Sequence, residues 1–303
     1  MRVVFSFFTT FLFVVFSSHV NAYSVTDSNG THEFESVPQR VVVLDWSLLE
    51  QVIELGVTPV GAPELESYAD WVVKPAIPQA TENVGTRSEP NLEKISALHP
   101  DLILISDTQN DVRDKLESIA PVLYYHNFSS EQDHASVAMQ QFLQLSDVFQ
   151  KRTLAQDKLA KLDCTLNNLR AQLEQAFGAT LPNVVLMRFA NVSSTFIYTQ
   201  GSIPVYVLRR LGLGVALEEA PAKWGIVQQP LTALKNISQG YVLYILPFNE
   251  EEKLQESILW KMMPFVRAGH VNAVDSVWSY GGAMSIQYTA QAVTQALLEV
   301  APK

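Results

Sequence analysis

The sequence predicts an α/β protein of two similar α/β lobes joined by one long helix, with a ligand cleft between the lobes. An apolar β-branched run over 41–44 passes, at a polar turn, into helical spacing over 48–55. A proline-free stretch over 133–177 follows later, and the alternation of strand and helix resumes after Gly178. Without its leader the chain keeps about 281 residues, which exceeds the usual size of one domain and fits two lobes.

The first lobe is predicted over residues 23–148. The strand 41–44 precedes a helix whose apolar residues recur over 48–55, and Gly56 is a typical helix stop. The continuous apolar run 102–105 is typical of a parallel strand that is covered on both faces. These elements predict a parallel sheet flanked by helices.

A connecting segment over 149–178 separates the lobes. Its part from Lys151 to Phe177 predicts a helix of about 40 Å, long enough to connect two lobes rather than cover one. Pairing in a coiled coil is the alternative, but a single imperfect stripe favours it less. The leucines of that stripe are Leu154, Leu159, Leu162, Leu166, Leu169 and Leu173.

The second lobe is predicted over residues 179–303 and repeats the alternation of the first. We expect it to be similar to the first lobe, so that the two face each other across a cleft, where ligands usually lie. Its predicted elements are the strands 184–187 and 195–198, the helix 205–211 before Gly212, and the strand 242–246.

Residues 1–22 predict a cleavable signal peptide for export. Arg2 is a short basic start, 3–16 is almost wholly apolar, and 20–22 supplies the small residues that signal peptidase needs. A permanent membrane anchor is the less favoured alternative, because the apolar run is shorter than the roughly 20 residues that cross a bilayer. No cysteine lies near the cleavage site, so the new amino terminus lacks the thiol that a lipoprotein needs for acylation. We expect a soluble mature protein that begins at Tyr23.

Composition excludes several classes of partner. The whole chain has a formal charge of −10, and it lacks a basic stripe with interleaved aromatic residues, so nucleic acid is not an expected partner. The one cysteine, Cys164, cannot form an internal disulfide. Nothing in the sequence indicates an oligomer, and we expect a monomer.

Catalytic and metal-binding motifs are absent from the sequence. It contains no glycine-rich phosphate loop, nucleophile elbow or paired-histidine zinc motif. A Ser/His/Asp triad assembles in space and stays open as an alternative, although no serine is singled out. The histidines after the leader have no ligand spacing, and we expect surface or loop positions rather than a metal site for His32, His99, His126, His134 and His270.

Aromatic residues stand out at turns, where a side chain can reach a ligand. Trp71 lies in a polar, proline-bounded stretch, which is unusual for a core tryptophan. Trp224, Trp278 and Tyr280 lie beside glycines in the second lobe. The alternative for each is a loop aromatic that packs against its own lobe.

Arg87 is the cationic residue that joins this set. It lies in the turn 84–91, before a helix predicted to begin near Leu92, and the alternative is a plain ion pair with Glu89. An aromatic cleft with one guanidinium fork suits a bulky, partly apolar ligand whose metal-bound oxygens are negative, such as a ferric hydroxamate complex.

Three strings in this order resemble the periplasmic ferric-hydroxamate (ferrichrome-type) siderophore-binding protein family, which serves class III ABC importers. They are 40–46, 84–93 and 263–269, the last followed by Trp278-Ser279-Tyr280-Gly281. The resemblance spans about residues 38–300. It implies two lobes on one rigid helix, slight closure on binding, a periplasmic location, and delivery of an iron(III) siderophore to an inner-membrane permease with its ATPase. It implies no enzymatic activity and no cofactor, since the siderophore itself saturates the iron.

The resemblance also implies roles for single residues. Arg87 would hold the hydroxamate oxygens, and Trp71, Trp224, Trp278 and Tyr280 would line the pocket. A further tyrosine of the family falls on Gln109, a departure that bears on affinity and on the choice of siderophore.

Importer docking in the wider class uses one acidic residue on each lobe. Glu93 takes the position on the first lobe, with a plain helix-start acid as the alternative, and 228–231 offers no acid on the second.

Two rival functions remain at this stage. Another bulky chelate, such as a catecholate siderophore, haem or cobalamin, is the nearer one. A ferric tri-catecholate usually needs several basic residues, whereas this pocket offers Arg87, with Arg188, Arg209 and Arg210 as further candidates. A secreted hydrolase or esterase acting on the siderophore is the other.

Overall fold

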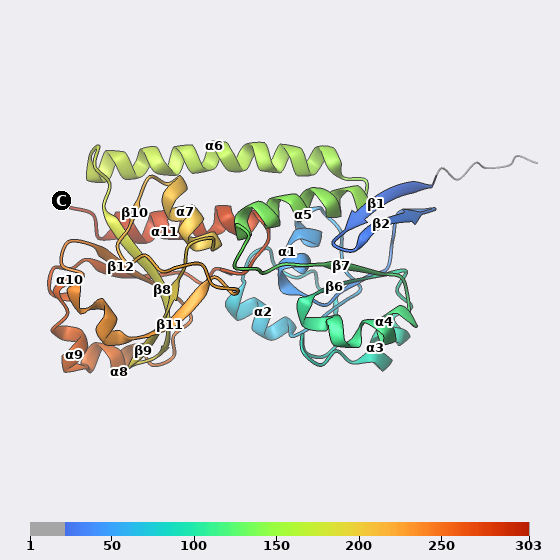
Figure 1. Cartoon of the computed structure of the whole chain (residues 1–303), viewed down its shortest axis with the longest axis horizontal. Coiled ribbons are helices and arrows are strands. Elements are labelled where there is room, and N and C mark those ends of the chain that lie inside the picture. Colours follow the sequence, from blue (N-terminus) through green and yellow to red (C-terminus); the bar gives the residue numbers. More distant parts are fainter. Residues whose placement is uncertain (1–21, 303) are drawn as a thin grey trace, which may run out of the picture.

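Two α/β lobes lie side by side, and the long helix α6 (Arg152–Phe177) runs along one side of both (Figure 1). The computed structural model describes residues 22–302, so the predicted leader 1–22, apart from its last residue, lies outside the described residues. None of the described helices combines the length and the apolar character that a bilayer crossing requires.

The first lobe is built on a five-stranded parallel sheet of order β5-β4-β3-β6-β7. Its central strands are fully buried, as their continuous apolar runs predict. The strands are β3 (Val41–Val43), β4 (Gly61–Ala62), β5 (Glu82–Asn83), β6 (Leu102–Ser106) and β7 (Val122–Tyr125). The helices are α1 (Trp46–Glu54), α2 (Leu65–Trp71), α3 (Leu92–Ala97), the 3-10 helix η1 (Asp107–Val112), α4 (Arg113–Glu117) and α5 (His134–Val148).

A hairpin that the sequence patterns did not predict precedes this sheet. Strands β1 (Tyr23–Asp27) and β2 (Gly30–Phe34) pair antiparallel. Asp27 fixes the turn by accepting hydrogen bonds from the backbone of Asn29 and Gly30, and it also accepts one from Tyr124 at the edge of the sheet. This hairpin thus packs against the edge of the first-lobe sheet.

The second lobe differs from the first in strand direction, so the expected similarity of the lobes holds for the layers and not for the sheet. The main path is β11-β9-β8-β12-β13, with β10 beside β8, and both β9 and β11 run antiparallel to their neighbours. The cause is local, because Asn191 caps a tight turn that folds β9 directly back on β8. The strands are β8 (Asn183–Asn191), β9 (Ser194–Tyr198), β10 (Gly214–Val215), β11 (Ile226–Pro230), β12 (Tyr241–Ile245) and β13 (Val271–Val274).

Helices cover both faces of the second sheet. The long α11 begins directly after the loop that follows β13. The helices of the second lobe are α7 (Ile203–Arg210), the 3-10 helix η2 (Leu231–Asn236), α8 (Glu251–Glu256), α9 (Ile258–Lys261), α10 (Pro264–Arg267) and α11 (Ala283–Glu299).

The long helix is not the only connection between the lobes. α11 packs against α6 and α7 and also against α1 and α5 of the first lobe. One hydrophobic cluster therefore contains Leu49 and Phe142 of the first lobe, Leu166 of α6, and Ala290 of the second. On α6, Leu162, Leu166 and Leu173 are buried, whereas Leu154 is 37% exposed. The predicted stripe thus begins about one turn later than its leucines suggest.

Polar contacts also join α1 to α11 and to α6. The carboxyl group of Glu50 on α1 accepts hydrogen bonds from Ser285 and from the backbone of Gly282, at the start of α11. Tyr288 and Lys158 both donate to Glu54, one turn further along α1. Desolvation by burial raises the pKa of Glu50 to about 8, so this carboxyl group is mostly protonated at neutral pH.

Candidate ligand-binding cavity

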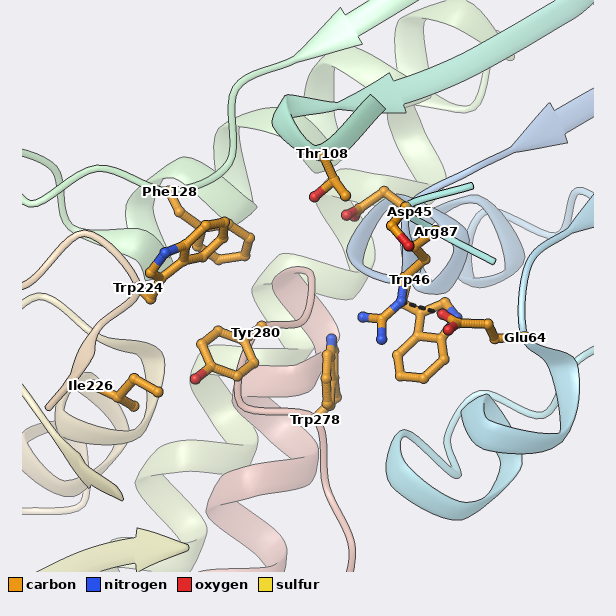
Figure 2. A pocket seen from close by; sticks show the side chains of 11 residues that line it. Asp45, Trp46, Glu64, Arg87, Thr108, Phe128, Trp224, Ile226, Trp278 and Tyr280 are labelled. Atoms are coloured by element: carbon orange, nitrogen blue, oxygen red, sulfur yellow. Dashed lines mark hydrogen bonds and ion pairs between the residues drawn. The ribbon is translucent and has the colours of Figure 1, made fainter. Parts of the chain in front are cut away.

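A cavity of about 370 Å³ opens between the lobes. Figure 2 shows first-lobe side chains on two sides of it and the loop that carries Trp278 and Tyr280 below. The lining residues are Asp45, Trp46, Glu64, Arg87, Ser88, Thr108, Phe128, Trp224, Ile226, Trp278 and Tyr280.

The first-lobe wall forms where three parallel strands end. Trp46 follows β3, Thr108 follows β6, and Phe128 follows β7. The carboxyl ends of parallel strands lie at one edge of a sheet, which is the usual ligand crevice of α/β proteins. Sequence reasoning did not assign these residues to a site, although the end of each apolar strand run was the signal that could have found them.

The guanidinium group of Arg87 is held in place by an aromatic ring and by a carboxylate. Its Cζ lies 3.6 Å from the centroid of the Trp46 ring, and its Nε donates to Glu64 Oε2 at 2.6 Å. The ion-pair partner is therefore Glu64, and the alternative partner Glu89 is wrong. Figure 2 shows the two terminal nitrogens of Arg87 directed into the cavity. The side chain thus presents a pair of parallel donors, which suits two neighbouring ligand oxygens.

The loop that carries Arg87 has a fixed backbone. Gly85 has φ +102°, and a Cβ there would lie 2.9 Å from backbone atoms of Asn91 and Glu89, so a side chain would not fit. The side chain of Gln109 donates to the Arg87 carbonyl at 2.7 Å and accepts from the Ser106 backbone at 3.0 Å. Gln109 is buried and lies outside the cavity lining, so it positions the loop from behind.

Aromatic rings form a continuous path between the lobes. Ring centroids of Trp46 and Trp278 are 5.1 Å apart, and those of Trp278 and Tyr280 are 5.3 Å apart. The path continues from Tyr280 to Phe128 at 5.8 Å and from Phe128 to Trp224 at 5.4 Å. Trp224 is 45% exposed and therefore has an open face at the cavity mouth. Such a wall suits a large ligand with an apolar surface.

Arg188 supports the second-lobe part of this path. The buried guanidinium donates to the carbonyls of Val277 and Leu246 and to the Tyr198 hydroxyl. It thereby fixes the residue that precedes Trp278. Arg188 was a further candidate contact for an anionic ligand, but these bonds occupy it outside the cavity lining.

The structure thus brings four of the predicted site residues together: Arg87, Trp224, Trp278 and Tyr280. Burial raises the pKa of Tyr280, which keeps its hydroxyl protonated. Trp71 is not among the lining residues. It is the last residue of α2, is 38% exposed, and its ring centroid lies 5.2 Å from Arg188 Cζ of the other lobe. Arg209 and Arg210 form ion pairs with Glu218 and Asp163, away from the cavity.

One histidine contradicts the expected surface positions. His134 is buried at the start of α5, and its ring packs against Phe128 at a centroid distance of 5.4 Å. Burial lowers its pKa, so the ring is neutral at pH 7 and supports the cavity wall. The described residues contain no group of three or more His, Cys, Asp or Glu side chains that could hold a metal ion.

Glu93 lies in the first turn of α3, on the surface of the first lobe. Its side chain is exposed, and it forms no ion pair with another described residue. It is therefore accessible from outside the molecule.

Comparison with known proteins agrees with this architecture. The chain is 25% identical over 271 residues to the iron(3+)-hydroxamate-binding protein FhuD of Escherichia coli, covering 89% of this chain and 90% of FhuD. It is 27% identical to the Fe(3+) dicitrate-binding periplasmic protein FecB of the same organism, covering 89% and 88%. These relatives are binding proteins for transport and not enzymes.

A solved structure is more similar. The Fe3+–Desferal-bound siderophore-binding protein FhuD of Vibrio cholerae is 55% identical and superposes with a TM-score of 0.86, covering 87% of this chain and 99% of that one. The periplasmic binding protein family itself matches residues 41–277, which include both sheets and nearly the whole cavity lining. The chain therefore belongs to the periplasmic binding protein family.

Proposed function

We propose that this protein captures iron(III)-hydroxamate siderophores in the periplasm and delivers them to an inner-membrane ABC permease. The observation that carries the proposal is the Arg87 guanidinium, whose two terminal nitrogens point into an aromatic cavity. Hydroxamate oxygens on ferric iron are paired and partly negative, and they suit such a fork. The relatives named above, which bind iron(3+) hydroxamate and Fe3+–Desferal, support the same ligand class.

The ligand enters as a complete iron complex in this proposal. The siderophore supplies the metal-bound oxygens, and the protein contacts the organic ligand through Arg87 and through the rings of Trp224, Trp278 and Tyr280. The lobes, assigned to residues 23–148 and 179–303, form the opposite walls. Arg87 is the one cation of the lining, which favours a hydroxamate over a highly charged catecholate complex.

Delivery requires a docking surface, and we assign Glu93 to it. The exposed carboxylate at the start of α3 is available to an arginine of a permease. Reversal of its charge in Glu93→Arg should reduce siderophore uptake in a reconstituted importer and leave ligand affinity unchanged. Equal uptake by both proteins would remove Glu93 from the docking surface.

Titration of tryptophan fluorescence with ferrichrome, ferrioxamine, a ferric catecholate and haem tests the ligand class. Saturable quenching by the hydroxamates alone is the expected result, since Trp224 and Trp278 lie at the cavity. Saturation by the catecholate or haem alone overturns the hydroxamate assignment. Mass spectrometry of the recovered ligand is the second readout: an intact siderophore is expected, whereas a cleaved one would indicate an esterase.

A further inference from the structure

The charged residues of the cavity lining are two acids and one base. Asp45, Glu64 and Arg87 together give the lining a formal charge of −1. Asp45 is bound from several sides, since it caps α1 and accepts hydrogen bonds from Ser106 and Asn127. Glu64 is different, because the hydrogen bond recorded for its side chain is the one from Arg87 Nε.

Cations outside the lining do not change this balance strongly. Arg188 is buried, but its donors are occupied by carbonyls and the Tyr198 hydroxyl. Lys223 lies 5.3 Å from the centroid of the Trp224 ring and is exposed, so solvent screens it. The charge that a ligand meets inside the cavity is therefore set mainly by Arg87 and by its partner.

The backbone places Glu64 against Arg87. Glu64 has a left-handed conformation with φ 51° and ψ 50°, which is uncommon for a residue with a side chain. Its backbone N–H donates to the carbonyl of Gly85 at 3.0 Å, in the loop that carries Arg87. The carboxylate and the guanidinium are thus tied together through their backbones as well as through their side chains.

We propose that Glu64 is a specificity-determining residue, whose carboxylate cancels the charge of Arg87 so that the cavity selects neutral ferric complexes over anionic ones. The inference rests on the proposed function and concerns the choice among ligands at that same site. Monoanionic hydroxamates balance the charge of ferric iron, so their complex is neutral. Doubly charged catecholates and citrate carboxylates leave an anionic complex, and the compensated Arg87 attracts it less.

The test is the variant Glu64→Gln, which keeps an amide oxygen as acceptor for Arg87 Nε and removes the negative charge. Dissociation constants are measured for ferrichrome, a neutral ferric tris-hydroxamate, and for an anionic ferric tris-catecholate. The expected result is a relative gain of at least tenfold for the catecholate. Glu66→Gln is the matched control, because Glu66 is an exposed acid in the first turn of the same helix and should leave the ratio unchanged.

Other results would overturn the proposal in distinct ways. If the ratio of the two dissociation constants is unchanged, Glu64 does not select among ligands. If affinity falls equally for both ligands, Glu64 only positions Arg87. Ferrioxamine, whose terminal amine makes its ferric complex a cation, and the N-acetylated form give a third arm: a loss confined to the free amine would make Glu64 a direct contact for that ammonium group. If the wild-type protein binds no hydroxamate at all, the proposed function fails, and not only the role of Glu64.

Discussion

Arg87 lies over the ring of Trp46 with 3.6 Å between Cζ and the ring centroid, and both residues belong to the first lobe. The half of the site that carries its positive charge is therefore assembled within the first lobe alone. The second lobe adds aromatic surface to it, through Trp278 at 5.1 Å from Trp46. Ligand affinity should thus depend on separate contributions from the two lobes.

Removal of the guanidinium tests the contribution of the first lobe. Arg87→Ala should weaken binding of a ferric hydroxamate by about 2 kcal/mol or more, because charge-assisted hydrogen bonds are lost. Arg87→Lys should recover little, since an ammonium group neither forms a fork nor stacks on Trp46 in the same way. Fluorescence titration gives the affinities. Arg113→Ala, which breaks an exposed ion pair with Glu117, is the control, and wild-type affinity in Arg87→Ala would refute the assignment.

Trp224 tests the contribution of the second lobe. Its exposed face should become covered by the ligand, so Trp224→Ala is expected to weaken binding by about 2 kcal/mol, and Trp224→Phe by less. Ile258→Ala is the control, because Ile258 is even more exposed but lies outside the cavity. Calorimetric titration measures the difference, and equal affinities of the alanine variant and the wild type would exclude Trp224 from the contact.

Gln109 should act through the position of Arg87 rather than through the ligand. Gln109→Ala leaves the Arg87 carbonyl and the Ser106 N–H without their partner, which should cost about 1–3 kcal/mol of unfolding free energy. Weaker ligand binding should accompany this loss. Denaturant unfolding and titration of the same samples check both effects. Asn110→Ala, at the exposed neighbouring position, should change neither.

Glu50 should make the stability of the protein depend on pH. The raised pKa of about 8 in the folded protein, against the ordinary value of 4.5 for a glutamate, means that the folded state holds the proton more tightly. Stability is then fully present below about pH 4.5 and falls as the pH rises toward 8, by about 1.4 kcal/mol per unit at most. In Glu50→Gln, the unfolding free energy should lack this part of its dependence on pH. Urea unfolding between pH 5 and 8 compares the two, and parallel curves would contradict the assignment.

Sequence patterns predicted the elements that depend on local periodicity. The buried strands over 41–44 and 102–105 and the long helix over 151–177 formed within a residue or two of their predicted limits, because apolar spacing acts within one element. The strand over 195–198 was predicted as well, but its antiparallel direction was not, since the turn at Asn191 decides strand direction and strand composition does not.

The candidate site was less accessible to the same reasoning. Trp46 is 2% exposed and appears in the sequence as an ordinary first residue of a helix. Its contact with Arg87 exists because β3, β4 and β5 are neighbours in one sheet. A local sequence pattern does not predict which strands are neighbours. Glu64 escaped notice for the same reason. Trp224, Trp278 and Tyr280 were found because glycines mark the turns that carry them.

The bond between Glu50 and Ser285 also imposes an order on assembly. The two residues are 235 positions apart, and the hydrogen bonds recorded for the Glu50 side chain among residues 22–302 come from Gly282 and Ser285. A chain that grows from its amino terminus therefore makes α1 long before the two partners of Glu50. Until α11 is present, the Glu50 carboxyl group lacks the donors that satisfy it in the folded protein. Burial of Glu50 together with its partners therefore requires that the whole segment between α1 and α11 has been synthesised.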